Sequence, residues 1–214
     1  MAKELRAYSR ALKLNSNQIA QTWVRVTAED TSRAQDASFR PGLEIAGLAL
    51  LKALKDTGIE MDLTGAIDSV RAAWGTYLAG AKLCDDTTEE LLSTLRSLTK
   101  SLGIVTDSDS SMVEPLISRL GLRQAFDIVL VSDEVGAYKP SPRVYLAALQ
   151  KANAQPESSL FVSNSRVDTL GALATGMGAV WVRRGIIHSN SEGIEGAIVI
   201  RDMSALPQVI REAA

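Results

Sequence analysis

Polar side chains with complementary chemistry follow short apolar runs in the second half of the chain, most of them directly and Lys139 at a greater distance along the sequence. They are Thr106, Asp107, Lys139, Ser163, Asn164, Ser165 and Asp168. Hydroxyl and backbone N–H groups can donate hydrogen bonds to the oxygen atoms of an anion, and a lysine supplies positive charge beside them. The set therefore predicts a binding site for a small anionic molecule.

These residues need a scaffold that brings distant segments to one edge, and the second half of the chain predicts one. Apolar runs cover 102–106, 128–131, 160–162, 179–182 and 197–200, and helical patterns cover 112–120, 143–152, 168–175 and 206–211. Continuous apolar runs indicate strands buried on both faces. Their alternation with helices indicates an α/β fold with a doubly wound, Rossmann-like parallel sheet. Ligands bind beyond the carboxyl ends of such strands, where the polar residues stand.

The first half of the chain has a helical pattern throughout. Apolar spacing predicts helices over 4–14, through Ile19 and Trp23, and over 42–55, 63–78 and 88–100. The last of these opens with Asp85-Asp86-Thr87-Thr88, where a cap and the early Glu89 and Glu90 suit the helix dipole. We therefore expect a helical module over 1–84 and an α/β module over 85–214.

Each candidate residue also has an ordinary structural role. Thr106 and Asp107 have the composition of a turn or helix cap, Asp168 stands where a helix begins, and Lys139 precedes Pro140 in a loop. His188 lies in a predicted surface loop, and we assign it no role. Cys84 has no basic neighbour that would activate its thiol.

The composition excludes several classes of protein. The chain has 214 residues and a net charge of -2, with both signs spread along it, so nucleic-acid binding is not expected. No apolar run is long enough to cross a membrane, and the N-terminus has no secretory signal. One cysteine and one histidine exclude an internal disulfide and a histidine-rich metal site. We expect a cytoplasmic location.

The order of the motifs is more specific than any single residue. Thr106 ends a strand, Lys139 lies in Gly-Ala-Tyr-Lys-Pro-Ser-Pro with Tyr145 six residues further on, and Asp168 ends Val-Ser-Asn-Ser-Arg-Val-Asp. This order resembles the haloacid dehalogenase (HAD) superfamily, most closely its 2-haloacid dehalogenase branch. Under this resemblance, 1–84 corresponds to the family's helical cap and 85–214 to its core.

The resemblance implies a role for each residue. Thr106 would hold a substrate oxygen, Lys139 would stabilise negative charge, and Asp168 would either support Mg²⁺ or position the hydrolytic water. Substrate contacts are implied for Asp107, Ser163, Asn164, Ser165 and Tyr145. No cofactor is implied if the protein is a dehalogenase, and Mg²⁺ is implied if it is a phosphatase. Ser163 and Asn164 replace the Gly-Asp of phosphatase relatives, which favours carbon–halogen hydrolysis.

One family motif has no counterpart in this chain. The family's first core strand ends in a nucleophilic aspartate, but residues 1–41 contain no strand-like run, and Asp30 and Asp36 lie in polar stretches. An alternative takes Asp107 as the nucleophile and Asp109 as the acid/base, but we favour the assignment of this segment to the second motif. Because the first strand lies in the middle of the family's sheet, its loss predicts a gap there.

Three interpretations follow. The sequence lacks an N-terminal segment that carries the strand, and the protein is a HAD hydrolase acting on a small anion. The chain is complete and is a non-catalytic binding or scaffold protein. Or another chain donates the strand, as in known strand-addition complexes. The oligomeric state is also left open, and a homodimer is one alternative.

Overall fold

The computed structural model describes residue 25 and residues 39–55, 59–184 and 193–213. The chain divides into two compact units, which we call the helical unit and the sheet unit. The helical unit comprises Met1–Lys82, Asp107–Leu116 and Val131–Ala137, and the sheet unit comprises Leu83–Thr106, Ile117–Leu130 and Tyr138–Ala214. The helices predicted over 4–14 and through Ile19 and Trp23, and the loop with His188, lie outside the described residues. Within the described ranges, no helix combines the length and apolar character needed to cross a membrane.

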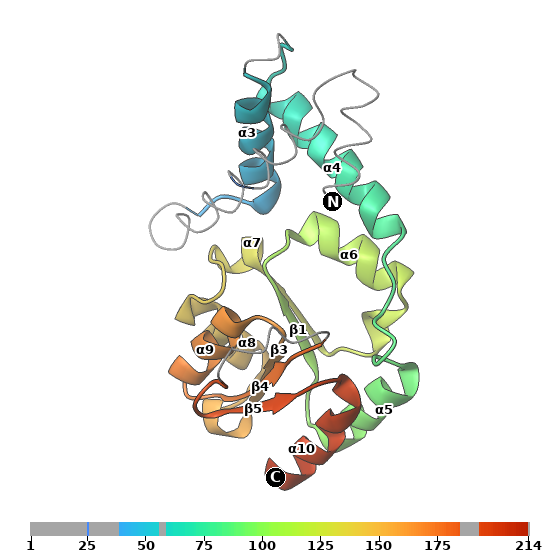
Figure 1. Cartoon of the computed structure of the whole chain (residues 1–214), viewed down its shortest axis with the longest axis vertical. Coiled ribbons are helices and arrows are strands. Elements are labelled where there is room, and N and C mark those ends of the chain that lie inside the picture. Colours follow the sequence, from blue (N-terminus) through green and yellow to red (C-terminus); the bar gives the residue numbers. More distant parts are fainter. Residues whose placement is uncertain (1–24, 26–38, 56–58, 185–192, 214) are drawn as a thin grey trace. The chain divides into compact units, whose positions relative to one another are not determined.

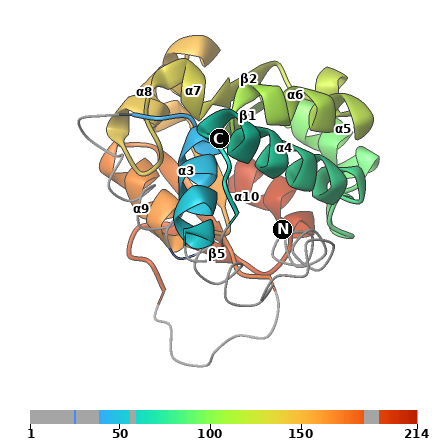
Figure 2. The ribbon, with the colours of Figure 1, turned by 90° about the horizontal axis from the view of Figure 1, so that it is seen from above.

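Two long helices form most of the described part of the helical unit. The predicted helices are confirmed as α3 (Gly42–Leu54) and α4 (Leu63–Ala79), which pack against each other (Figure 2). The start of α6 (Ser110–Arg119) and the short α7 (Ser132–Val135) also belong to this unit. The sequence analysis did not predict α7, because four residues are too few to show a helical period.

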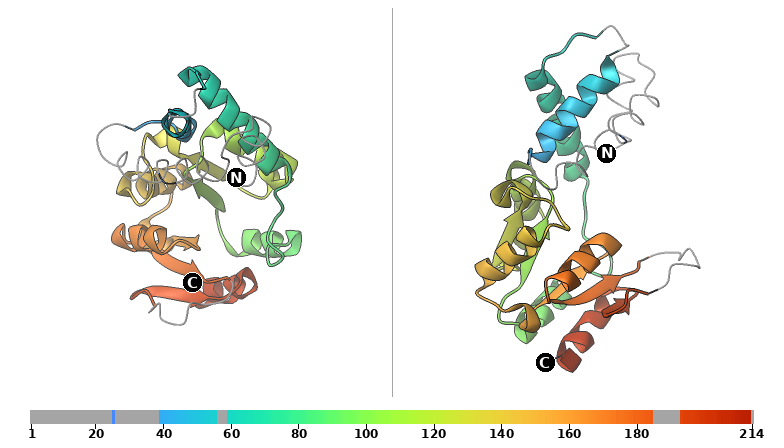
Figure 3. Two further views of the ribbon diagram at one scale, coloured as in Figure 1. Left: turned by 45° about the horizontal axis from the view of Figure 1, so that its top comes forward. Right: turned by 90° about the vertical axis from the view of Figure 1, so that its left-hand side faces the viewer.

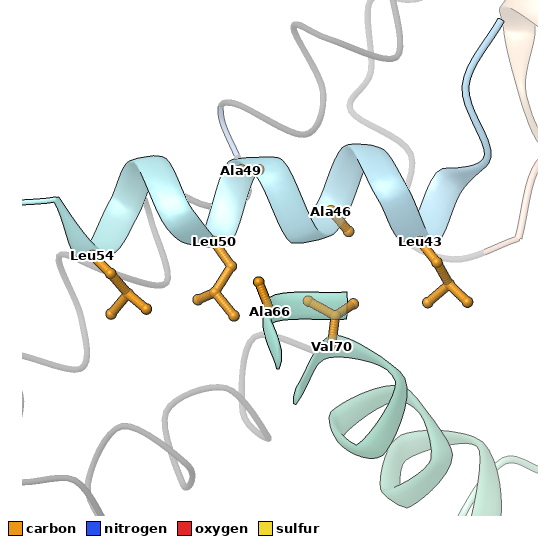
Figure 4. Close-up of a cluster of buried hydrophobic side chains, with 7 residues drawn as sticks. All are labelled: Leu43, Ala46, Ala49, Leu50, Leu54, Ala66 and Val70. Carbon is orange, nitrogen blue, oxygen red and sulfur yellow. The ribbon is translucent and has the colours of Figure 1, made fainter. Parts of the chain in front are cut away.

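A compact apolar seam holds α3 against α4. Figure 4 shows Leu43, Leu50 and Leu54 on the face of α3 that meets Ala66 and Val70 of α4. A methyl group added at Gly47 would come within 2.8 Å of the Ile67 side chain. The two backbones therefore approach closely because small residues stand at the crossing.

A carboxylate from a distant segment caps the start of α3. Pro41 provides no side-chain cap. Instead, Asp109 Oδ1 accepts a hydrogen bond from the Gly42 N–H (2.7 Å), and Oδ2 accepts one from the Leu43 N–H (2.8 Å). Asp109 is buried, and both its oxygens bind backbone. This does not fit the alternative in which Asp109 is an acid/base, because both carboxylate oxygens already accept hydrogen bonds from the first N–H groups of α3.

The sheet unit is the predicted parallel α/β fold. Its strands are β1 (Gly103–Thr106), β2 (Ile128–Val131, whose last residue belongs to the helical unit), β3 (Leu160–Ser163), β4 (Gly178–Val182) and β5 (Ala197–Ile200). Its helices are α5 (Glu89–Leu98), α8 (Pro142–Ala152), α9 (Arg166–Ala174) and α10 (Leu206–Ala213), with short 3₁₀ turns η1 (Leu122–Gln124), η2 (Pro156–Ser158) and η3 (Met203–Ala205). The cap expected within 85–88 is Thr88, which accepts a hydrogen bond from the Leu91 N–H at the start of α5.

Strand pairing is interrupted between β1 and β3. Among the described residues, β1 pairs with β2 in a two-stranded sheet, and β3, β4 and β5 form a separate three-stranded sheet in that order. The three strands are parallel, with Leu160 opposite Gly178 and Ala179 opposite Ala197. Among these residues, the predicted parallel sheet therefore consists of two pieces, and the expected gap in the sheet stays a prediction.

The strands differ in burial. Of β4, which pairs on both sides, four residues are buried, whereas β1 has none and β3 has only Phe161. Ile198 and Val199 of β5 are exposed. The expectation that every strand is buried on both faces is thus wrong for β1 and β5, since a strand with one neighbour leaves an edge and part of its side chains uncovered.

Two apolar layers cover the faces of the sheet unit. On one face, α5 and α10 pack against Val180, Val182 and Ile200. On the other, α8 and α9 pack against Phe161 and Ala179. The C-terminal α10, drawn in red, lies beside the three-stranded sheet, and α8 and α9 lie on the opposite side (Figures 1 and 3).

Candidate active site

An ion pair lies at the carboxyl ends of the strands in the sheet unit. Lys139 Nζ is 3.1 Å from Asp168 Oδ2 and donates a hydrogen bond to the Val105 carbonyl oxygen at 3.2 Å. The two charged side chains are only 10% and 16% exposed. Lys139 precedes α8, Asp168 lies in the first turn of α9, and Val105 belongs to β1. One ammonium group thus connects the ends of the two sheet pieces.

The start of α9 fixes the position of the carboxylate. Ser165 is the N-cap, and its Oγ accepts a hydrogen bond from the Asp168 N–H at 3.2 Å. The same hydroxyl donates to Asp168 Oδ1 at 3.0 Å, and Ser163 Oγ lies 3.5 Å from Oδ2. Ser163 Oγ also accepts a hydrogen bond from the Ser165 N–H at 3.0 Å. The ordinary role of this carboxylate at a helix start and its place beside Lys139 are therefore compatible.

Tyr145 contacts the backbone of Asp168 through a partly buried hydrogen bond. Its ring is fully buried, and its hydroxyl donates a hydrogen bond to the Asp168 backbone carbonyl at 2.9 Å. The ring packs edge-on against Phe161, with 5.2 Å between ring centroids. A Cβ atom at Gly171 would lie 2.5 Å from the Tyr145 hydroxyl, so only glycine fits there. Contact of Tyr145 with a substrate stays a prediction, whereas its contact with Asp168 is observed.

For three further predicted residues, Thr106, Asn164 and Asp107, the structure shows where the backbone lies and what it contacts. Thr106 ends β1, directly after the Val105 carbonyl that binds Lys139. The Asn164 carbonyl accepts a hydrogen bond from Trp181 Nε1 at 3.2 Å. Asp107 belongs to the helical unit, where its carbonyl accepts a hydrogen bond from Ser132 Oγ at 3.0 Å. The structure thus brings together Lys139, Ser163, Ser165 and Asp168.

The sequence analysis missed two supporting groups. One is the Val105 carbonyl, a backbone acceptor that no side-chain pattern reports. The other is Gly171, which permits the close approach of Tyr145 to α9. A glycine in the middle of a helical pattern often indicates close packing, so Gly171 could have been predicted from the sequence.

The described residues do not make up a Mg²⁺ site by themselves. Through the described ranges, no group of three acidic, histidine or cysteine side chains converges on one point. Asp168 offers one carboxylate, and the Lys139 ammonium already lies 3.1 Å from it. Mg²⁺ prefers six oxygen ligands in octahedral geometry, so we derive no step through a metal from these residues.

A second carboxylate of the sheet unit pairs with an arginine away from this site. Asp86 Oδ2 lies 2.7 Å from Arg184 Nε and accepts a hydrogen bond from the Met203 N–H at 3.0 Å. The hydrogen bond from Arg184 is the main cause that lowers the pKa of Asp86 below its usual value and raises the pKa of Arg184. This pair joins the start of the sheet unit to β4 and η3, and it has a structural role.

The family model of the haloacid dehalogenase-like hydrolases matches residues 14–182, and the chain belongs to this family. The chain is 32% identical over 130 residues to glyceraldehyde 3-phosphate phosphatase of Methanothermobacter thermautotrophicus, covering 58% of this chain and 57% of that protein. It is 28% identical over 122 residues to an Escherichia coli pyrimidine 5'-nucleotidase, covering 56% and 53%. The chain therefore spans about half the length of these relatives.

The fold also matches solved structures. The L-2-haloacid dehalogenase of Xanthobacter autotrophicus, with chloropropionic acid covalently bound, superposes with a TM-score of 0.75 at 21% identity, covering 100% of this chain and 94% of that one. A HAD phosphatase of Thermococcus onnurineus gives a TM-score of 0.65 at 21% identity, covering 98% and 86%. At this level of identity the likeness concerns the fold alone.

Proposed function

We propose that this hydrolase acts on a small anionic molecule bound at the carboxyl ends of β1 and β3. The observation that carries the proposal is the Lys139 ammonium. It is largely buried, pairs with the Asp168 carboxylate and donates a hydrogen bond to the Val105 carbonyl oxygen. A buried cation close to hydroxyl groups is suited to hold an anion and to stabilise charge that develops on it. In this proposal Thr106 and Ser163 donate to substrate oxygens, and Asp168 orients the attacking water.

Carbon–halogen hydrolysis is the first candidate reaction. It is supported by the pair Ser163 and Asn164, which replaces the Gly-Asp expected of phosphatase relatives, and by the direct contact of Asp168 with Lys139. Phosphoester hydrolysis is the second candidate, because the relatives that match in sequence are a phosphatase and a nucleotidase. That candidate needs Mg²⁺ with ligands in addition to Asp168. Both reactions need a nucleophilic carboxylate, and we assign this role to no residue of the described ranges.

Anion binding tests the site, and turnover tests the reaction. Calorimetry with 2-chloropropionate and with phosphate measures binding, and halide or phosphate release measures turnover. We expect Lys139→Met to weaken anion binding at least about tenfold, the value of one charge-assisted hydrogen bond. Lys151→Met is the matched control, because Lys151 also donates to a strand carbonyl, Val129, but on an exposed surface.

The results separate the interpretations. Equal anion binding by wild type and Lys139→Met would contradict the site. Binding that depends on Lys139 without turnover of either compound would support the non-catalytic interpretation. Halide release lost in Lys139→Met but kept in Lys151→Met would support the dehalogenase.

A further inference from the structure

A tryptophan of the sheet unit contacts the short turn that leads to Asp168. β3 ends at Ser163, Ser165 caps α9, and Asn164 lies between the strand and that cap. Trp181 Nε1 donates a hydrogen bond to the Asn164 carbonyl oxygen at 3.2 Å. Because so short a turn has few backbone conformations, the direction of this carbonyl sets where the cap and the first turn of α9 lie.

The strand register explains how this side chain reaches the turn. Trp181 lies opposite Ser163 in the parallel pairing of β4 with β3. Alternate residues of a strand share a face, and the pair two residues earlier, Phe161 and Ala179, packs on the side of α8 and α9. The Trp181 side chain therefore lies on the face that α9 covers, beside the end of β3.

The indole group of Trp181 is held in place by its surroundings. β4 pairs with β3 on one side and with β5 on the other, and the Arg183 N–H extends the ladder by donating to the Ile200 carbonyl at 2.8 Å. The Arg183 guanidinium carbon lies 4.8 Å from the centroid of the Trp181 ring, and Trp181 is only 7% exposed. A donor fixed by its packing loses little conformational freedom when it binds the turn.

The turn carries both hydroxyl groups that contact Asp168. Ser163 Oγ accepts a hydrogen bond from the Ser165 N–H, and Ser165 Oγ bonds to both Oδ1 and the N–H of Asp168. The other carboxylate oxygen, Asp168 Oδ2, lies 3.1 Å from Lys139 Nζ. A rotation of the turn would therefore move this oxygen relative to the ammonium while the strands kept their places.

We propose that Trp181 is a positioning residue of the anion site, whose indole N–H fixes the turn over 163–165 and thereby the Asp168 carboxylate relative to Lys139. Trp181 acts through the Asn164 carbonyl and does not need to contact the anion. The effect on anion binding rests on the proposed function, whereas the fixing of the turn does not.

Two changes at position 181 separate the N–H donor from the size of the ring. Site-specific incorporation of benzothienylalanine in place of Trp181 exchanges the indole N–H for a sulfur atom and keeps the shape of the side chain. Trp181→Phe also removes the donor but keeps an aromatic ring beside Arg183. Trp74→Phe is the matched control, since it makes the same exchange at a tryptophan of α4 that packs edge-on against Tyr77.

Amide hydrogen exchange, followed by NMR on the full chain without added anion, measures how often the turn opens. We expect the Ser165 and Asp168 amides to exchange about three- to tenfold faster after both changes at position 181, the range for one lost hydrogen bond. Amides in the middle of β4 should keep their rates, and Trp74→Phe should leave all these amides unchanged.

Calorimetry with 2-chloropropionate connects the turn to the anion site. Both changes at position 181 should weaken binding by about threefold or more when Lys139 is present. The same changes should have no effect in the background of Lys139→Met, because the Asp168 carboxylate then has no ammonium to orient. A side chain that only supports the fold would not produce this dependence on Lys139.

Three results would overturn the inference. The first is unchanged exchange of the Ser165 and Asp168 amides in the benzothienylalanine protein, since the N–H would then not hold the turn. The second is equal acceleration of exchange throughout β3 and β4, which would mean that the ring only supports the sheet. The third is equal weakening of anion binding with and without Lys139. If the wild type binds no anion, the proposed function fails, while faster exchange of these two amides alone would still support the positioning of Asp168.

Discussion

Selected carboxylates of the two units have different partners. In the helical unit, Asp109 and Asp133 accept hydrogen bonds from backbone N–H groups at the starts of α3 and α6. In the sheet unit, Asp168 and Asp86 lie beside Lys139 and Arg184. A carboxylate that caps a helix is committed to backbone groups that cannot leave. A carboxylate beside a flexible cation can exchange that partner for a ligand, which fits the anion site that we propose at Lys139 and Asp168.

The largest expected effect comes from removing the cation of the most buried pair. Lys139→Met leaves the Asp168 carboxylate without its ammonium in a site where both side chains are largely buried. We expect the free energy of unfolding to fall by about 2–3 kcal/mol, since a nearly buried charge loses its partner. Urea denaturation followed by circular dichroism measures it.

The double variant Lys139→Met/Asp168→Asn is the control for this effect. It removes both charges, so part of the lost stability should return, and the coupling between the two changes should exceed about 1 kcal/mol. Strict additivity of the two changes would contradict the idea that the pair acts as a unit. Lys151→Met, an exposed lysine on α8, should change stability by less than about 0.5 kcal/mol.

The next effect tests the carboxylates of the helical unit. Asp109→Ala removes the acceptor for two backbone N–H groups at the start of α3, and Asp109 is buried. We expect a loss of about 2 kcal/mol, the upper end for a helix cap. Amide hydrogen exchange should become faster in the first turn of α3 and stay unchanged in β3 and β4.

A local cap gives the matched comparison. Asp62 caps α4 from the adjacent position, accepting a hydrogen bond from the Gly65 N–H at 2.8 Å on an exposed surface. Asp62→Ala should cost about 0.5–1 kcal/mol, less than Asp109→Ala, because water can replace an exposed cap. Equal losses for the two variants would show that burial of Asp109 adds nothing.

These two caps also show what the sequence can and cannot predict. Asp62 and Thr88 stand directly before the helices that they cap, and such adjacent caps leave a local pattern, as the polar segment ending in Thr88 did for α5. Asp109 caps a helix that begins 67 residues earlier in the chain, and no local pattern reports such a contact. Its place in an Asp-x-Asp motif suggested acid/base chemistry, which the fold does not support.

The sheet was predictable for a similar reason. Apolar runs predicted all five strands to within about two residues, and the order of motifs placed Lys139 and Asp168 at one rim. The partial burial of β1 and β3 was not predicted, because burial depends on neighbours in space. The partly buried hydrogen bond from Tyr145 to the Asp168 carbonyl likewise depends on the packing of α8 against α9.

A smaller effect, with a defined pH dependence, is expected at Asp86. Its pKa is lowered in the folded chain, mainly by the hydrogen bond from Arg184. The ionised carboxylate therefore stabilises the fold above the pKa of the unfolded chain, and this stability is lost as the pH falls through the lower, folded value. Asp86→Asn should cost about 1 kcal/mol at neutral pH.

Denaturation at a series of pH values checks the sign of this effect. The difference between wild type and Asp86→Asn should be constant near neutral pH and should shrink under acid conditions, below the usual range for aspartate. A difference that grew on acidification would contradict the assigned pKa direction. Asp127, whose pKa is also lowered, chiefly by the Leu102 backbone N–H, contributes to the same acid transition in wild type and variant and therefore cancels in the difference.

The smallest effect is expected for the shortest ion-pair distance. Arg71 Nη1 lies 2.6 Å from Asp68 Oδ1 on α4, but the two side chains are 52% and 61% exposed. Water and salt screen such a pair, so Arg71→Ala should change the free energy of unfolding by no more than about 0.5 kcal/mol. Urea denaturation at low and at high salt measures this value, and a loss near that of Lys139→Met would contradict the argument. Since the Lys139 pair is longer at 3.1 Å and is expected to matter more, burial rather than distance decides which carboxylates stabilise this protein.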